Sequence, residues 1–246
     1  MEKTMNVLES DKCNAKKTIE KEQLNFNRIK YLNLCKTRNL NQKIVEVCLP
    51  SFFGDTEELH ADNYPNFMIY YINCMHPFPL SQFQRKIEQD NQNNDTNFNS
   101  NMKKIFDNIS VIDCFNLDDF STVILKLIQS IKIKKLQDEK KQQQLHRQGE
   151  KNDHEIIKLL IVVTGLDIMW DTYNIHGGVE SKSRLNTILL RIRSLRTFDA
   201  DFDIKTILIF PHHFDDGKVS DVLAVKRRNR FILSNYVARY YADALV

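Results

Sequence analysis

Glycine is scarce in this chain, and its glycines do not form a phosphate-binding loop. The 246 residues include six glycines. None lies in the pattern G-x-x-x-x-G-K-S/T, in which backbone amides and a lysine hold nucleotide phosphates. Gly54 has no lysine after it, and Gly177-Gly178 follows the wrong strand for such a loop. We therefore expect no bound nucleotide and no other cofactor.

Paired cysteines and long apolar runs are also missing. The five cysteines are widely spaced and include no C-x-x-C pair, so neither a zinc ribbon nor a disulfide framework is expected. No apolar run reaches the length of a membrane span, and the first residues lack a hydrophobic signal core. We expect no membrane contact and a reducing compartment, the nucleus or the cytoplasm.

Catalytic and metal-binding residue types do not form a convincing constellation. His212–Asp216 (HHFDD) offers metal-ligand types, but no third spaced ligand accompanies them, which favours a polar loop. Asp118 and Asp119 could act as paired carboxylates, yet their position at a helix start explains them through the helix dipole. The residues therefore predict a protein that is not an enzyme.

What the sequence does contain is a series of apolar runs of strand length. The clearest, Leu159–Val163 (LLIVV), is continuous, as expected for a strand covered on both faces in a parallel sheet. An amphipathic helix over 182–196 follows, and then a second apolar strand over Ile204–Phe210. Strand, crossover helix and strand make a βαβ unit, which predicts an α/β fold.

Other segments complete this predicted sheet and its insertions. Residues 1–42 are interpreted as a mobile N-terminal extension and residues 43–246 as one domain. Disordered insertions are expected near 90–101 and 137–153, which are polar and nearly free of apolar residues. The remaining predictions are strands over Lys43–Leu49, Phe67–Cys74 and Ile109–Cys114, a helix from Ser81, and a helix capped by Asn116 that ends near Lys135.

The strand over Leu159–Val163 and the two elements after it resemble the Walker B strand, helix and next core strand of a RecA-like ATPase. A Walker B strand ends in an acid that holds a metal ion, and Val163 occupies that place. Together with the glycine pattern, the resemblance implies a RecA-like core sheet flanked by helices. It also implies that the ATPase phosphate loop and the Walker B acid are both lacking.

The sharpest charged feature is the run from Lys226 to Arg230 (KRRNR). Four cations within five residues repel one another unless an anion is near, and phosphate is the natural anion. Lys218, in the same loop after strand 204–210, is expected to add to such a contact. A solvated surface run or a nuclear-import signal would have the same composition, so the residues alone leave DNA contact and these alternatives open.

Two weaker features carry further hypotheses. The helix over 182–196 has a second basic set that includes Arg184 and Arg191. A solvated outer face is favoured for it over a DNA or partner surface. Phe78 stands between Pro77 and Pro79, which restrict the local backbone. It is either a rigid anchor for a protein partner or a staple that closes the edge of the domain.

Two short segments carry a more specific resemblance. Pro77–Gln84 (PFPLSQFQ) and Arg239–Leu245 (RYYADAL) resemble segments of a subunit of the budding-yeast Shu complex. That subunit belongs to the chromosome segregation in meiosis protein 2 family, a divergent paralogue of the eukaryotic RecA-like recombinase. The order of elements agrees over about residues 43–89 and 105–246, as a resemblance of pattern.

The resemblance implies a non-catalytic subunit that forms a heterodimer with a second RecA-like Shu subunit, within a larger hetero-oligomer. This recombination mediator binds forked or single-stranded DNA. It promotes recombinase filament assembly in homologous recombination and error-free DNA damage repair, in the nucleus. The family's basic loop after the last core strand carries DNA binding over to Lys226, Arg227, Arg228 and Arg230, with Asn229 interrupting the run. Recombinase paralogues are the implied protein partners, and Phe78 is the candidate contact with them.

Two alternatives remain beside the mediator hypothesis. The chain could be a scaffold whose partner carries all DNA binding, with the basic loop used for nuclear import. It could also be a cryptic ATPase that borrows a phosphate loop from its partner across an interface. Neutralising the basic loop and testing the assembled complex for retained ATP distinguish these three hypotheses.

Overall fold

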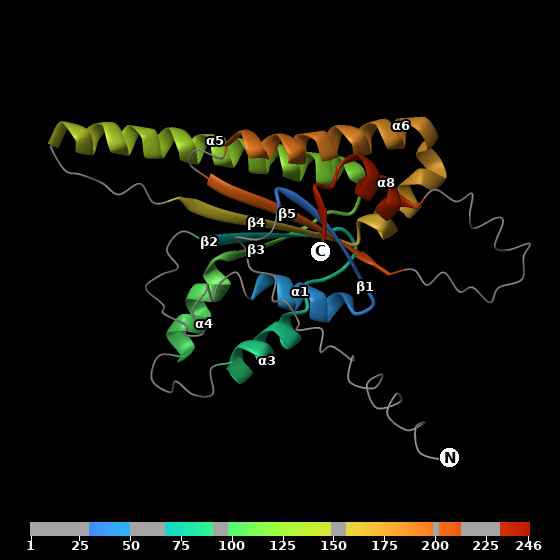
Figure 1. Ribbon diagram of the computed structural model, residues 1–246, viewed down its shortest axis with the longest axis horizontal. Coiled ribbons are helices and arrows are strands. Elements are labelled where there is room, and N and C mark those ends of the chain that lie inside the picture. The colour runs from blue at the N-terminus through green and yellow to red at the C-terminus, as the bar shows by residue number, and fades with distance from the viewer. Residues whose placement is uncertain (1–29, 50–66, 91–97, 149–155, 199–201, 213–231) are drawn as a thin grey trace, which may run out of the picture.

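A six-stranded parallel sheet forms the centre of the protein (Figure 1). The computed structural model describes residues 30–49, 67–90, 98–148, 156–198, 202–212 and 232–246. The strand order is β3-β2-β4-β5-β1-β6, and all five pairings between neighbours are parallel. The strands are β1 (Leu32–Thr37), β2 (Phe67–Asn73), β3 (Ile109–Asp113), β4 (Ile157–Thr164), β5 (Phe202–Pro211) and β6 (Ala244–Leu245).

Helices cover both faces of the sheet (Figure 1). One face carries α1 (Leu40–Cys48), α3 (Leu80–Asp90) and α4 (Phe98–Asp107). The other carries α5 (Leu117–Gln148), α6 (Leu166–Ser194) with the short 3-10 turn η3 (Leu195–Phe198), and α8 (Leu233–Tyr240). Each face buries its own apolar cluster. The predicted α/β fold, a parallel sheet flanked by helices, is confirmed, and it is consistent with a RecA-like core.

The two central strands explain why their sequences are continuous apolar runs. From Leu159 to Thr164 every residue of β4 is buried, and in β5 burial is unbroken from Ile204 to Phe210. A strand with helices on both sides has no solvent-facing residues to alternate with. The predicted strands at 159–163, 204–210, 67–74 and 109–114 are therefore all confirmed, within a residue or two at each end.

The beginning of the fold differs from the sequence prediction. The predicted strand over Lys43–Leu49 is wrong, because Leu40–Cys48 forms helix α1. Asn39 caps this helix through its side-chain oxygen, which accepts from the amide of Gln42. Leu32–Thr37, assigned by sequence to the mobile extension, is strand β1, so the domain boundary predicted at residue 43 is placed too late.

The first described strand, β1, is held by strands that come much later in the sequence. β1 pairs with β5 on one side and with β6 on the other. The buried amide of Asn33 donates to the carbonyl of Thr206, at 3.1 Å, and to that of Lys30. Asp243 exchanges two hydrogen bonds with the backbone of Leu32. The N-terminal strand is thus fixed by residues near the other end of the chain.

Helix α5 is longer than predicted. Its start agrees with expectation, since Asn116 accepts a capping hydrogen bond from the amide of Asp119 at 2.8 Å. It does not end near Lys135 but continues to Gln148, so the insertion predicted at 137–153 is wrong for residues 137–148. Glu, Lys and Gln are good helix formers even without an apolar face. No helix among the described residues is long and apolar enough to cross a membrane.

Candidate nucleic-acid interface

The carboxyl ends of the strands are where ligand sites are expected in this architecture, at points where neighbouring connections leave toward opposite faces. β2 leads to α3 on one face, whereas β4 leads to α6 on the other. The same divergence occurs at β1, which leads to α1, and β5, after which the next described helix is α8. In the described residues, a turn of the chain covers the end of β4, whereas a groove lies at the end of β1.

The end of β2 and β4 is filled by the chain itself. Gly165, directly after β4, has φ +72, and a Cβ placed there would lie 2.0 Å from the carbonyl oxygen of Cys74. The amide of Cys74 donates to the carbonyl of Thr164 at 2.8 Å. The turn after β2 therefore lies directly on the end of β4, and only glycine permits this approach.

Side chains under this turn satisfy one another. The hydroxyls of Tyr71 and Thr164 are 2.7 Å apart, and both reach the carbonyl oxygen of His76. Burial is the main cause that raises the pKa of Tyr71. The His76 ring contacts the side-chain oxygen of Asn41 at 2.9 Å. Burial lowers the pKa of His76 from 6.5, while the nearby Asp167 carboxylate opposes that change. Among the described residues, this network joins the polar groups at the end of β2 and β4 to one another.

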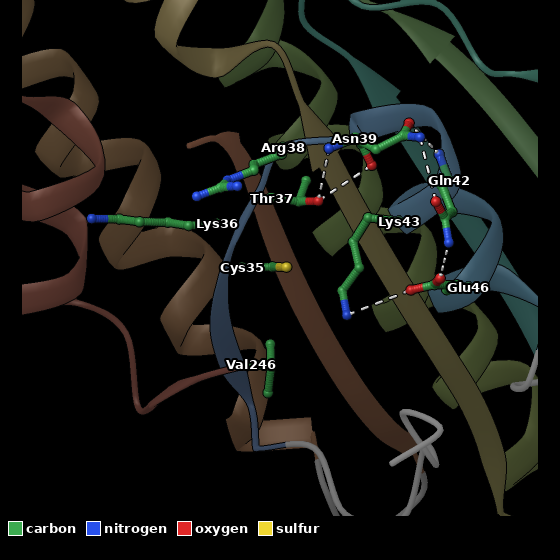
Figure 2. Close-up of a pocket in the computed structure, with 9 residues that line it drawn as sticks. All are labelled: Cys35, Lys36, Thr37, Arg38, Asn39, Gln42, Lys43, Glu46 and Val246. Carbon is green, nitrogen blue, oxygen red and sulfur yellow. Dashed lines mark hydrogen bonds and ion pairs between the residues drawn. The ribbon is translucent and has the colours of Figure 1, made fainter. Parts of the chain in front are cut away.

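The end of β1 is open. A groove of about 470 Å³ lies there, lined by Cys35, Lys36, Thr37, Arg38, Asn39, Gln42, Lys43, Glu46 and Val246 (Figure 2). β6 pairs only with Asn33 and Leu34, so β1 continues beyond its partner strand on this side. We call this cavity the β1 groove.

Cations lie on both sides of β1 at this end of the strand. In Figure 2, Lys36 and Arg38 extend to one side of β1, where Lys36 donates to Asn235 of α8, and Lys43 projects from α1 on the other side. Lys36 and Arg38 are exposed and Lys43 is half-buried. Among the described lining side chains, the single carboxylate is that of Glu46, 3.9 Å from the Lys43 ammonium. These side chains, three cationic and one acidic, favour the approach of an anion.

The predicted DNA-binding residues lie outside the described residues. These are Lys218, Lys226, Arg227, Arg228 and Arg230. The residues on either side of this segment are described, and both contact the end of β1. The amide of His212 donates to the carbonyl of Thr37 at 2.7 Å, and Lys36 donates to Asn235 of α8 at 2.6 Å. The chain enters and leaves this basic segment beside the β1 groove.

The basic face predicted for helix 182–196 is largely used within the fold. Arg184 of α6 pairs with Glu180 and with Asp118 of α5, and these partners raise its pKa. Arg191 donates to the Ser121 hydroxyl of α5 at 2.9 Å. These two arginines join α6 to α5, and the Arg184 side chain is still 40% exposed. The solvated outer face favoured from sequence stays a prediction.

Phe78 lies in an aromatic cluster. Its ring centroid is 5.0 Å from that of Tyr71 and 5.2 Å from that of Phe83. Both neighbours are fully buried, and Phe78 itself is half-buried. This packing agrees with the hypothesis of a staple at the domain edge. Its role in binding a protein partner stays a prediction.

Lys36, Arg38 and Lys43 were not predicted as site residues from the sequence. The first two lay in the segment interpreted as a mobile extension, and Lys43 lay in a predicted strand. The detectable signal was a short apolar stretch, LNLC, followed by a basic turn and the capping residue Asn39. Metal chemistry finds no support in the described ranges, where no three His, Cys, Asp or Glu side chains converge on a point that could hold an ion.

The fold and this edge define a class: a parallel α/β protein with helices on both faces and an open, cation-bordered groove at one strand end. Residues 46–242 match the family model described as "Shu complex component Csm2, DNA-binding". The chain belongs to this family of Shu complex components.

Two curated relatives agree with the family match, and both are named "Chromosome segregation in meiosis protein 2". The protein from Saccharomyces cerevisiae is 25% identical over 190 residues, which cover 72% of this chain and 82% of the relative. The protein from Candida glabrata is 26% identical over 145 residues, which cover 58% of each chain. The predicted family is therefore confirmed.

Proposed function

We propose that this chain is a non-catalytic, DNA-binding subunit of a Shu-type complex that promotes recombinase filament assembly during homologous recombination and error-free repair of DNA damage. The observation that carries the proposal is the family match over residues 46–242, whose description includes DNA binding. The site would include Lys218, Lys226, Arg227, Arg228 and Arg230, in the segment that starts and ends beside the end of β1.

The mechanism is electrostatic and independent of sequence. Lysine and arginine side chains contact backbone phosphates and release counterions, and they read no base edges. Each neutralised phosphate adds about −0.7 to −0.9 to the slope of log affinity against log salt. Contacts by the four cations at 226–230 would therefore contribute about −3 to −4. The bound strand would then be held in place for a growing recombinase filament.

The end of β4 supports a role without catalysis. Val163 stands where a nucleotide-hydrolysing enzyme of this architecture needs an acid, and its side chain is buried. Thr164, the next residue, is occupied by its hydrogen bonds to Tyr71 and His76. The partner would be a second RecA-like Shu subunit in a heterodimer, with recombinase paralogues as further partners. The place of action would be the nucleus.

The experiment is fluorescence anisotropy on forked and single-stranded DNA over a salt series, with the chain co-expressed with its partner subunit. Changing Lys226, Arg227, Arg228 and Arg230 together to Ala is expected to weaken binding strongly and to make the salt slope shallower by about 3. Unchanged affinity and slope would contradict the proposal. That result would favour the second candidate, a scaffold whose basic segment serves nuclear import.

A further inference from the structure

We propose that the carboxyl end of β1, with the β1 groove beside it, is a second DNA-binding surface, which takes phosphates of the DNA backbone along the cations Lys36, Arg38 and Lys43. The proposal rests on the DNA binding proposed above and adds a separate site. It uses described residues alone. Eight of its nine lining residues lie outside 46–242, the range that matches the family model, and Glu46 is the one exception.

The first support is the arrangement of charge around a real hollow. The groove has about 470 Å³ of space, and its cations come from three elements: a strand, the turn after it and a helix. Lys43 is paired with Glu46 at 3.9 Å, which is a loose contact for two partly exposed groups. The Lys36 ammonium has one neutral partner, the amide oxygen of Asn235. A phosphate can compete with contacts of this kind.

The second support is position. The groove lies at the carboxyl end of β1, and the next described helices after β1 and β5, α1 and α8, lie on opposite faces of the sheet. Thr37 and Lys36 contact His212 and Asn235, which are described residues before and after the segment with the proposed DNA-binding cations. A second cationic surface at this end of β1 would therefore extend the DNA-binding path from the points where that segment begins and ends.

The chemistry of the lining favours a polymer backbone over a free nucleotide. Only Arg38 and Asn39 connect β1 to α1, which is too short for a loop whose amides wrap a triphosphate. The side chain of Asn39 already accepts from the amide of Gln42. Among the described residues that line the groove there is no aromatic side chain, so these residues offer no platform for a base. Long, exposed cationic side chains suit phosphodiesters that pass through an open channel.

Binding through the described cations alone gives this surface a specific expected behaviour. Phosphate contacts without base stacking should hold single-stranded and double-stranded arms alike and show no sequence preference. Its contribution should depend steeply on salt, with about 0.7 to 0.9 of slope for each phosphate contacted. Three contacts correspond to about 2 to 3 in slope and to at least about tenfold in affinity at 0.1 M salt.

The test compares three sets of substitutions in the chain co-expressed with its partner subunit. The groove variant is Lys36→Gln/Arg38→Gln/Lys43→Gln. The matched control, Lys126→Gln/Lys132→Gln/Lys140→Gln, removes the same charge from exposed positions of α5, on the other face of the sheet. The third variant changes the cations at 226–230 to Ala. Thermal unfolding verifies that each variant is folded before its anisotropy is measured on fork, single-stranded and duplex DNA.

The inference is supported if the groove variant loses about tenfold or more in affinity on all three DNAs with a shallower slope, while the α5 control changes little. It is overturned if the groove variant binds like the intact complex while the 226–230 variant does not, and the proposed function then stands. If the intact complex binds no DNA even at low salt, both the function and the inference fail.

Two further measurements separate other outcomes. Labelled ATP retained by the intact complex and lost by the groove variant would make the groove a nucleotide site and overturn the inference. A photo-crosslinking residue at position 42, in the groove lining, should form adducts with DNA, whereas one at the exposed position 129 of α5 should not. Equal yields at the two positions would also count against the groove.

Discussion

The end of β4 and the end of β1 occupy comparable positions in the sheet, yet they are built in opposite ways. At β4, the turn after β2 approaches the backbone closely, and Tyr71, Thr164 and His76 satisfy one another's hydrogen bonds. At β1, the strand extends past its neighbour and three cations border a groove. A strand end whose polar groups are mutually satisfied serves stability, whereas one that gathers like charges is prepared for a ligand.

The largest expected effect comes from a substitution in the turn at the end of β4. Gly165→Ala places a Cβ at 2.0 Å from the Cys74 carbonyl oxygen and requires φ +72 of an alanine. We expect a loss of about 3 kcal/mol or more in the free energy of unfolding, measured by urea denaturation. As a control, Gln129→Ala on the exposed surface of α5 should change it by less than about 0.5 kcal/mol. An unchanged midpoint for Gly165→Ala would show that the turn is not seated on β4.

A smaller effect tests the hydrogen bonds at the same end. Thr164→Val keeps the shape of the buried side chain but removes the hydroxyl that contacts Tyr71 and the His76 carbonyl. The expected cost is about 1–3 kcal/mol, because buried partners are left unsatisfied. A double-mutant cycle with Tyr71→Phe should give a coupling of at least about 0.5 kcal/mol. Additive effects of the two substitutions would argue against a shared network.

A third prediction tests how the charge of the β1 groove affects DNA binding. Glu46→Gln removes the single side-chain carboxylate of the β1 groove and leaves its cations in place. We expect DNA affinity to rise by about twofold to fivefold, with a steeper salt dependence, in the same anisotropy assay. Glu88→Gln, which makes the same charge change at an exposed position of α3, is the control. Equal effects of the two substitutions would mean that net charge alone controls binding.

The smallest expected effect concerns pH at the closed end. The pKa of His76 is lowered in the folded state from 6.5, mainly by burial. Below pH 6.5 the unfolded chain therefore binds more protons at this residue, and stability contributed by the neutral ring is lost as pH falls. Denaturation midpoints between pH 7.5 and 5 should fall more for the intact chain than for His76→Gln. Identical pH profiles would mean that the ring protonates freely in the folded protein.

The strands in the middle of the sheet were predictable because burial on both faces removes polar residues from their sequences. β4 and β5 have such continuous runs. β1 could not be recognised in the same way, since Asn33 interrupts its apolar residues. That amide is buried and satisfied by the carbonyls of Lys30 and Thr206, and the second lies far along the chain. A partner so distant leaves no local pattern.

Helix α1 and the end of α5 were missed for a related reason. KIVEVCL is an apolar stretch of strand length, and its apolar residues also fit the period of a helix. Its choice of helix is explained by the cap from Asn39 and by burial of Ile44, Val45, Val47 and Cys48. The polar end of α5 was taken for an insertion, because composition alone weighs apolar content and not helix propensity.

The cations of the candidate site also differ in how far they can be recognised from the sequence. Cations at 226–230 stand out because they are adjacent in sequence, and their role in DNA binding stays a prediction. Lys36, Arg38 and Lys43 are separated by ordinary residues and belong to three elements. Only the packing of α1 beside the end of β1 brings them to one end of the sheet, with Lys36 and Arg38 on one side of β1 and Lys43 on the other. No count of charge along the chain could have indicated this.

The placement of β1 also has a consequence for how the chain folds. β1 is the first described strand, yet its two partners, β5 and β6, come after residue 201. During synthesis, β1 therefore cannot pair until β5 and β6 have been made. Contacts of such long sequence separation slow folding. Until then its apolar residues are exposed to aggregation. A tag or truncation that disturbs Lys30 should thus produce the same folding failure as one that disturbs Asp243, although the two residues lie near opposite ends of the sequence.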